Sequence, residues 1–221
     1  MQESVVIVVD DDPSVRRSVS ALLAAHGYVV REFASGAEFL ASPEIGRPGC
    51  IVMDLRMPGM SGLDVQAALA EKKLNPRIVF ITGYGDVPST VRAMKGGAVD
   101  FLEKPFKSQD LLEAVDRALK QDTTRRAESA REDEIRRRFE RLTRREFEVV
   151  EQVVRGLTNK AIAIGFGISE KTIKVHRGRA MTKVEADSLA QLVRMAQTIG
   201  IGGDGVIATT QRGATDEEDD D

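Results

Sequence analysis

The chain has 221 residues, of which 42% are hydrophobic and 30% charged, and its formal net charge is −3. These values are ordinary for a globular protein, and the length allows two compact domains. No apolar run approaches the roughly 20 residues that cross a bilayer, and aspartates directly follow the first apolar run, so we expect neither a membrane span nor a signal peptide. The lone Cys50 excludes an internal disulfide, which agrees with a cytoplasmic location.

Charge is distributed unevenly along the chain. Residues 1–120 carry 14 Lys+Arg against 16 Asp+Glu, residues 121–199 carry 17 against 12, and residues 200–221 carry 1 against 7. A basic segment therefore lies between an acidic domain and an acidic tail. By itself this pattern is weak evidence that the basic segment binds a polyanion.

Residues 1–120 alternate short β-rich runs with helical patterns. The apolar runs lack an alternation of apolar and polar residues, which indicates strands of a parallel sheet covered on both faces. They cover residues 5–9, 28–33, 50–53, 77–81 and 99–102. Helices are expected to follow them, opened by Asp12-Pro13, Ser35, Ser61, Asp86 and Ser108. Five such βα units predict an α/β domain with a doubly wound, five-stranded parallel sheet.

Residues 121–138 are charged and nearly free of large apolar side chains. Charge pairs at i,i+4 can continue the preceding helix through this stretch, and a flexible joint is the alternative. We assign it as a charged, helical linker between domains.

Residues 139–199 contain no convincing strand. Thr143 with Glu146 forms a capping box, and Thr158, Ser169 and Ser188 precede further helical patterns, while Gly156 and Gly167 end two of them. This order predicts an all-α, four-helix domain with a helix-turn-helix in its centre. Residues 200–221 have the composition of a disordered acidic tail, which either competes with DNA for the basic segment or, as we favour, stays solvated.

Polar residues follow the predicted strands at the edge where doubly wound sheets bind ligands. Asp10 and Asp11 end the first strand, Asp54 the third and Thr82 the fourth, and Lys104 follows the fifth. Clustered carboxylates need a cation, and Mg²⁺ takes one or two carboxylates with waters and phosphate oxygens. We assign Mg²⁺ to Asp11 and Asp54, with Asp10 helping to set the site. An aspartate can also attack a phosphoryl donor. The alternative reading is a helix-capping cluster with an unrelated surface lysine and turn threonine.

The motifs D-D at 10–11, M-D-L-R-M-P-G-M-S-G at 53–62, I-T-G at 81–83 and F-L-E-K-P-F at 101–106 resemble the receiver domain of two-component response regulators. G-Y-G-D-V-P at 83–88 resembles the FixJ branch. The resemblance implies that a histidine kinase phosphorylates Asp54, that Mg²⁺ also touches the backbone carbonyl of Arg56, and that the Lys104–Pro105 bond is cis. It further implies that Thr82 moves toward the phosphoryl group and that Phe101 turns inward as a switch.

The predicted helix at 169–183 is rich in cations. Its residues Lys171, Lys174, Val175 and Gly178 share one face, while an apolar face can pack against the domain. One face can therefore enter a major groove, with Lys174 and Val175 nearest the base edges and Lys171 beside them. The residues expected at phosphates are Asn159, Lys160, Thr172, Arg177, Arg179 and Lys183. The plain alternative is a helical bundle with a solvated basic face.

The segments L-T-R-R-E-F-E-V at 142–149, T-N-K-A-I-A at 158–163, I-S-E-K-T-I-K-V-H at 168–176 and S-L-A-Q-L-V-R-M at 188–195 resemble the LuxR-type helix-turn-helix of the NarL/FixJ regulators. Two glycines depart from that pattern. Gly165 stands where the scaffold helix usually has a better helix former, at a cost of roughly 1 kcal/mol. Gly178 stands where some relatives have a base-reading side chain, so the target sequence of a relative is not carried over.

Together these features predict a phosphorylation-switched transcription regulator. Phosphorylation of Asp54 adds roughly two negative charges, recruits Thr82 and draws Phe101 inward. The face formed by residues 86–102 then favours a homodimer and frees residues 139–199, so that two recognition helices bind half-sites of promoter DNA. The expected partners are a sensor histidine kinase, promoter DNA and RNA polymerase, with no membrane.

Two alternatives remain open. One is a constitutive DNA-binding regulator with an inert receiver, which the complete set Asp10, Asp11, Asp54, Thr82 and Lys104 disfavours. The other is an aspartate-nucleophile phosphatase, which needs a second acid–base aspartate two residues after the nucleophile, where this chain has Arg56. We therefore expect stoichiometric self-phosphorylation and no enzyme activity.

Overall fold

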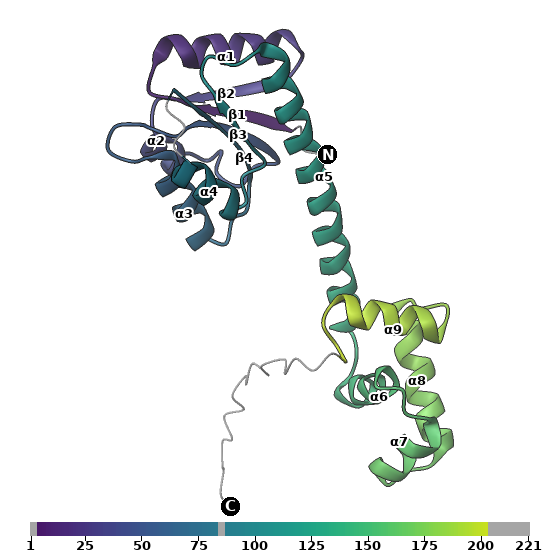
Figure 1. The fold of residues 1–221 in the computed structure, drawn as a ribbon. Helices are drawn as coiled ribbons and strands as arrows, with labels where there is room; N and C mark the ends of the chain where they lie inside the picture. The colour runs from purple at the N-terminus through teal and green to yellow at the C-terminus, as the bar shows by residue number, and fades with distance from the viewer. Residues whose placement is uncertain (1–3, 84–86, 203–221) are drawn as a thin grey trace, which may run out of the picture. The chain divides into compact units, whose positions relative to one another are not determined.

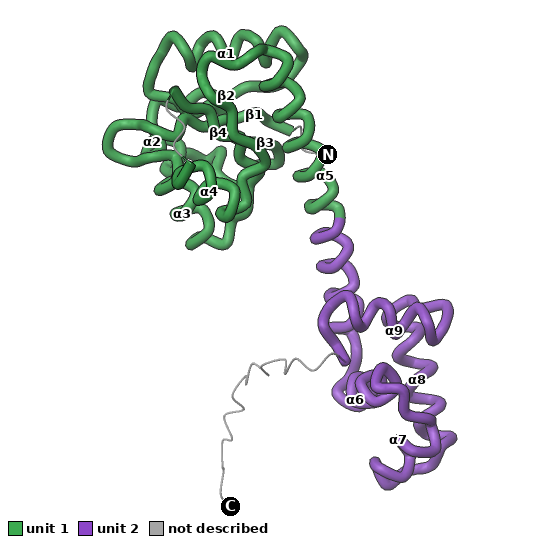
Figure 2. The backbone as a smooth tube through the Cα atoms, viewed as in Figure 1, with its two compact units in different colours: residues 1–127 green, residues 128–221 purple. Residues whose placement is uncertain are grey.

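A computed structural model describes residues 4–83 and 87–202 of the chain. The chain divides into two compact units with the boundary between residues 127 and 128, coloured separately in Figure 2. Within the described ranges, no helix combines the length and apolar character that a membrane span needs.

The first unit is built on one parallel sheet with strand order β2-β1-β3-β4-β5. Its strands are β1 (Val5–Val9), β2 (Val29–Phe33), β3 (Gly49–Asp54), β4 (Arg77–Thr82) and β5 (Asp100–Glu103). Asp54 pairs with Ile81, and Thr82 pairs with Glu103. The register therefore brings the ends of β3 and β4 to one edge of the sheet. The predicted doubly wound α/β fold is confirmed.

Helices cover both faces of the sheet (Figure 1). They are α1 (Pro13–Ala25), α2 (Gly36–Ala41), α3 (Gly62–Glu71), α4 (Val87–Lys95) and the first part of α5 (Ser108–Phe139). The predicted N-caps Asp12, Ser35 and Ser61 all accept hydrogen bonds from backbone amides of the helices they open. Asp86 lies outside the described residues. Ser108 was expected to cap α5 but is its first residue, so the helix begins one position earlier than predicted.

The two faces of the sheet have separate hydrophobic cores because successive strand residues point to opposite sides. Val5, Ile7 and Val9 pack on the face that also holds side chains of α2, α3 and α4. Val6 and Val8 pack on the other face, against side chains of α1 and α5. All five residues of β1 are buried, which explains why the sequence showed no alternation in this strand.

Residues 121–138 lie within α5, which runs without interruption from Ser108 to Phe139. Asp122 ties this helix to the first unit. Its buried carboxylate accepts hydrogen bonds from the Gly49 amide at 2.9 Å and from Arg126 at 2.6 Å. Arg126 in turn donates to the carbonyl oxygens of Gly46 and Arg47. These contacts explain why the first compact unit ends at Ala127 and not at residue 120.

The second unit contains the end of α5 and the helices α6 (Arg144–Val154), α7 (Asn159–Phe166), α8 (Glu170–Val184) and α9 (Leu189–Thr198). The capping box of Thr143 and Glu146 is present, and Thr158, Ser169 and Ser188 cap the helices that follow them. One hydrophobic core joins these helices, and its fully buried side chains include Val149, Val150, Ile173, Ala180, Val184 and Leu192.

Candidate functional site: a receiver pocket and a basic helix

Two buried carboxylates share one ammonium group at the edge where β1, β3 and β5 end. Asp10 is 1% exposed and Asp54 is 5% exposed. The Nζ atom of Lys104 donates to Oδ2 of Asp10 at 2.7 Å and to Oδ1 of Asp54 at 2.8 Å. Residues far apart in the sequence therefore meet as predicted, in one small polar cluster.

The second oxygen of the Asp54 carboxylate is also held. Its Oδ2 atom accepts a hydrogen bond from the backbone amide of Arg56 at 3.0 Å. Gly62, the first residue of α3, lets that helix begin close to the end of β3, because a Cβ there would lie 2.5 Å from the carbonyl oxygen of Asp54. The glycine that ends the motif at 53–62 therefore places the start of α3 beside Asp54.

Asp10 is positioned by a contact that the sequence did not reveal. The Nη1 atom of Arg16 donates to the carbonyl oxygen of Asp10 at 2.6 Å, and its Nε atom lies 3.6 Å from a carboxylate oxygen of Glu32. The amide of Asp12 donates to Oδ1 of Asp10 at 2.9 Å. The sequence does show Arg16 six residues after Asp10. We had assigned Arg16 only to the predicted helix that follows Asp12-Pro13, and so did not expect its contact with Asp10.

The charges in this cluster do not balance. Burial raises the pKa of the Asp54 carboxyl, although its hydrogen bond with Lys104 opposes that shift. Burial disfavours the charge on Lys104, yet the hydrogen bonds to Asp10 and Asp54 outweigh it and raise the pKa of Lys104. Two carboxylates thus face a single cation, and hard oxygen ligands with excess negative charge fit a divalent ion such as Mg²⁺.

Asp11 and Asp12 follow Asp10 directly in the chain. Asp11 is exposed, and Asp12 caps α1 by accepting from the amides of Ser14 and Val15. Within the described residues, no group of three or more His, Cys, Asp or Glu side chains is arranged as a metal centre. Of the three aspartates assigned to Mg²⁺ from the sequence, Asp10 and Asp54 are joined through Lys104, and Asp11 is exposed.

Thr82 and Phe101 lie on the neighbouring strands β4 and β5. Thr82 is fully buried at the end of β4, and its carbonyl oxygen accepts from the amide of Lys104 at 2.7 Å. Phe101 is half-buried on β5 and packs against the core between the sheet and α2–α4. The Lys104–Pro105 bond is cis, as the family resemblance implied.

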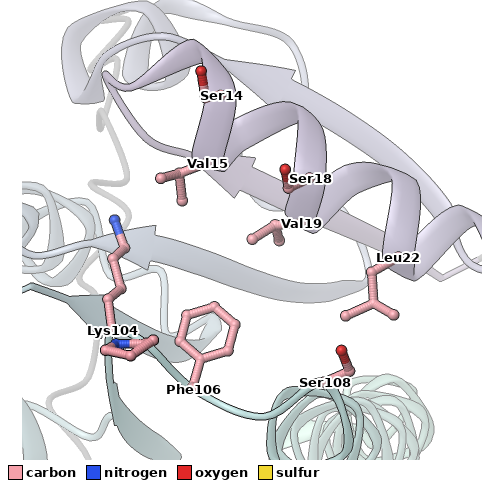
Figure 3. A pocket seen from close by; sticks show the side chains of 9 residues that line it. Ser14, Val15, Ser18, Val19, Leu22, Lys104, Phe106 and Ser108 are labelled. Atoms are coloured by element: carbon pink, nitrogen blue, oxygen red, sulfur yellow. The ribbon is translucent and has the colours of Figure 1, made fainter.

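A pocket of about 630 Å³ lies beside Lys104. Figure 3 shows Val15, Ser18 and Leu22 of α1 on one side, and Lys104, Phe106 and Ser108 on the other. Lys104 stands at one end of this mostly apolar surface, and its ammonium group also contacts Asp10 and Asp54.

Helix α8 carries the predicted DNA-reading residues on its outer surface. Lys171, Lys174 and Arg179 are exposed, and Val175 is 44% exposed. The opposite face of the helix is buried through Ile173, Ala180 and Val184, as the sequence pattern indicated. The structure thus separates a packing face from a basic face on one helix.

Some of the cations assigned to phosphate contact have partners within the protein. Lys183 donates to Oε2 of the buried Glu146 at 2.6 Å, so it ties α8 to the start of α6. Arg177 donates to Oδ1 of Asn159 at 3.2 Å, and Lys174 lies 3.5 Å from Glu170. Lys160 is exposed, and Thr172 is half-buried beside the cap Ser169. Glu146 was predicted as a helix cap, and its second role with Lys183 was missed.

Comparisons with known proteins agree with both parts of this description. Residues 6–116 match the family model of the response regulator receiver domain, and residues 140–196 match that of the bacterial regulatory proteins of the luxR family. Nodulation protein W of Bradyrhizobium diazoefficiens is 47% identical over 199 residues, covering 90% of this chain and 88% of that protein. Transcriptional regulatory protein FixJ of Rhizobium meliloti is 43% identical over 202 residues, covering 91% and 99%.

Two solved structures of similar length resemble the chain. The response regulator StyR has a TM-score of 0.79 at 44% identity, covering 89% of this chain and 99% of its own. Full-length FixJ from B. japonicum has a TM-score of 0.55 at 38% identity, covering 90% and 98%.

Proposed function

Because the chain belongs to the two-component response regulators that join a receiver domain to a LuxR-type DNA-binding domain, we propose that it accepts a phosphoryl group on Asp54 and that this modification controls its binding to promoter DNA. The observation that carries the proposal is the pair of buried carboxylates, Asp10 and Asp54, held on the one ammonium group of Lys104.

Asp54 is the nucleophile in this proposal. One of its oxygens forms a bond to phosphorus while the bond from phosphorus to the donor, the phosphohistidine of a sensor kinase, breaks and leaves the imidazole with the electron pair. Lys104 and the amide of Arg56 already contact the two carboxylate oxygens, so both are placed to donate to the phosphoryl oxygens that arrive there. The apolar pocket beside Lys104 gives a protein donor a surface next to this carboxylate.

The carboxylates of Asp10, Asp11 and Asp54, with the carbonyl of Arg56, are the ligands we propose for Mg²⁺. The bound ion would supply the positive charge that the cluster lacks and that the phosphoryl oxygens require. The ammonium group of Lys104 is the second positive charge at the site. It contacts Oδ1 of Asp54, whereas the amide of Arg56 contacts Oδ2. Thr82, at the end of the neighbouring strand, would donate its hydroxyl to the phosphoryl group once that group is in place.

The proposed output of the switch is dimerisation through residues 86–102, of which Asp86 lies outside the described residues. On α4, Val87, Val91 and Met94 are 76%, 44% and 47% exposed. Their spacing places them on one face of the helix, where an apolar surface supports contact with a second copy. Phe101, which follows on β5, links this face to the carboxylate cluster when it turns inward.

Promoter DNA is the proposed ligand of the second unit. Helix α8 would enter the major groove with Lys174 and Val175 at base edges and Lys171 beside them. The cations proposed for phosphate contact are Lys160, Arg177 and Arg179, with Asn159, Thr172 and Lys183 alongside. Because Lys183 is held by Glu146, we expect its share of phosphate binding to be smaller than that of the exposed cations.

Acyl-phosphate labelling tests the central step. We expect the full chain to gain one phosphoryl group per molecule with acetyl phosphate and Mg²⁺, on Asp54, and Asp54→Asn to gain none. An unlabelled wild-type chain would favour the alternative of a DNA-binding regulator with an inert receiver. Continuous turnover of a phosphate ester would instead favour the phosphatase, although Arg56 stands where that chemistry needs an acid–base carboxylate.

A further inference from the structure

An acidic segment of the chain has no part in the proposed function. Residues 216–221 are six consecutive aspartates and glutamates, and they lie outside the described residues. They also lie beyond both family models, which end at residues 116 and 196. The negative charge of residues 216–221 therefore lies outside the parts of the chain that match the receiver and helix-turn-helix families.

The basic face of α8 is the surface whose charge complements this segment. Lys171, Lys174 and Arg179 are exposed there, and the only acidic residue in the helix is Glu170. The Glu170 carboxylate already lies 3.5 Å from the ammonium of Lys174, with both side chains about half exposed. A solvent-exposed cation of this face, Lys174, therefore already pairs with a carboxylate.

The acidic segment can reach this face from where the described chain stops. Ile201 is 3% exposed, packs in the core of the second unit, and its amide donates to the carbonyl of Ala196 at 2.8 Å. The residues from 202 to 216 can span up to roughly 45 Å when extended. A folded unit of this size has a radius of gyration of only about 11 Å. Every face of the second unit is therefore within reach.

We propose that the acidic segment 216–221 binds the basic face of α8 in its own chain and that DNA must displace it. The tether keeps the segment at an effective concentration on the order of millimolar, so weak ion pairs are enough for partial occupancy. Random duplexes, which contact only the cations, are excluded more strongly than a promoter that also offers base contacts. The internal contact replaces the solvated tail favoured from the sequence, because α8 exposes Lys171, Lys174 and Arg179 within reach of the acidic segment. This inference rests on the proposed DNA-binding function and adds its regulation by the chain itself.

The test compares the full chain with a variant of equal length in which the segment is neutral: Asp216→Asn, Glu217→Gln, Glu218→Gln, Asp219→Asn, Asp220→Asn and Asp221→Asn. Affinity for a random-sequence duplex is measured by fluorescence anisotropy. At about 50 mM salt we expect the neutral variant to bind roughly threefold to tenfold more tightly, with the two affinities converging near 300 mM. Its affinity should also fall more steeply with salt, because no internal anion competes.

A pair of smaller variants separates local binding from net charge. Asp219→Asn, Asp220→Asn and Asp221→Asn should raise the affinity at low salt, whereas Glu71→Gln, Glu103→Gln and Asp110→Asn, three exposed positions on the first unit, should change it much less. Equal effects of the two triple variants would overturn the proposal, as would equal affinities of the wild type and the neutral variant.

Carbodiimide cross-linking without DNA provides a readout that does not depend on DNA binding. We expect a link from residues 216–221 to Lys171 or Lys174, lost in the neutral variant and suppressed by excess duplex. Absence of that link would overturn the proposal. If neither the wild type nor the neutral variant bound any duplex while the wild type still formed the cross-link, the proposed DNA-binding function would be contradicted. The contact between residues 216–221 and α8 would then still be supported.

Discussion

Burial of the charged Asp54 carboxylate lowers the stability of the folded protein, and the effect can be measured. Burial raises its pKa, so folding favours the neutral carboxyl. Its contribution to stability is complete below the unfolded pKa of about 3.9 and is lost as the pH rises through the higher folded pKa. At neutral pH the charged Asp54 therefore destabilises the first unit.

We expect Asp54→Asn to raise the free energy of unfolding of the first unit at pH 7 in EDTA, by on the order of 1 kcal/mol. The gain should shrink at pH 4, where the wild-type carboxyl binds its proton. Addition of Mg²⁺ should stabilise the wild type more than the variant, because the ion neutralises a charge that only the wild type has. Thermal unfolding at both pH values checks this, and a variant less stable than the wild type in EDTA at pH 7 would contradict it.

Two lysines of α8 should respond differently to the same substitution. Lys183→Gln removes the ammonium from the buried carboxylate of Glu146, so we expect a loss of roughly 1–3 kcal/mol in the stability of the second unit. Lys174→Gln breaks only an exposed pair with Glu170, so its stability should stay within about 0.5 kcal/mol while DNA affinity falls. Hydrogen exchange of α6 and α8 measures the first effect and anisotropy the second. If Lys183→Gln lowered DNA affinity without a loss of stability, Lys183 would face DNA and not Glu146.

Individual residues were predictable where local chemistry singled them out. Asp10, Asp54, Thr82 and Lys104 follow predicted strands, and parallel strands end at one edge, so their meeting was expected from the order of elements alone. Arg16 was missed because its partner is a backbone carbonyl, and a backbone acceptor leaves no mark in the sequence. The pairing of Lys183 with Glu146 depends on how α6 packs on α8, which the pattern of each helix does not contain.

At the scale of elements, the starts of α1, α2, α3 and α6 to α9 were predictable because a serine, threonine or aspartate side chain caps each of them. The extent of the first unit was not. Its boundary at Ala127 depends on Asp122 and Arg126, which read as two more charges in a charged linker but contact the loop before β3. A charge pattern does not distinguish a solvated pair from one that reaches another element.

Two glycines near the end of α7 should have opposite effects when replaced by alanine. A Cβ at either Gly165 or Gly167 would meet nothing within 4 Å, so packing does not distinguish them. Gly167 has φ of 65° and Gly165 does not lie in the left-handed region. Gly165→Ala should therefore stabilise the second unit by roughly 0.5–1 kcal/mol, and Gly167→Ala should destabilise it by about 1–2 kcal/mol. Urea unfolding, monitored by hydrogen exchange in α8, measures the change in the free energy of unfolding for each variant. If both variants were stabilised or both destabilised, the backbone argument would be contradicted.

The contact of α5 with the first unit should depend on pH. Burial opposes ionisation of Asp122, but hydrogen bonds from the Gly49 amide, Arg126 and Arg125 outweigh it and lower the pKa of Asp122. Its contribution to stability is thus present above the unfolded pKa of about 3.9 and is lost as the pH falls through the lower folded pKa. Asp122→Asn should cost roughly 1–3 kcal/mol at pH 7.

That cost should diminish as the wild-type carboxylate is protonated in acid. Glu113→Gln, at an exposed position of the same helix, should change stability by less than about 0.5 kcal/mol. Chemical denaturation across this pH range, with hydrogen exchange at residues 120–127, provides the measurement. A penalty for Asp122→Asn that stays constant into acid would show that shape, and not charge, is what the helix contact requires.

At the scale of the whole molecule, the chain joins a receiver domain, which we propose takes a phosphoryl group, to a LuxR-type DNA-binding domain whose residues 139–199 are basic. The charge counts along the sequence already separated these two parts, and each has its own hydrophobic core. In the proposed account, Asp54 influences the second unit by changing the association of two copies. The carboxylate and the DNA-binding helix therefore need no direct contact.

The affinity for a promoter duplex, measured with and without acetyl phosphate in the presence of Mg²⁺, tests this account most directly. We expect the phosphodonor to tighten binding by the wild-type chain between about fivefold and 150-fold, the usual range of coupling between sites, together with dimerisation. Asp54→Asn should bind with the affinity of the unphosphorylated wild type in both conditions. Equal affinity of the wild type with and without donor, despite labelled Asp54, would contradict the account.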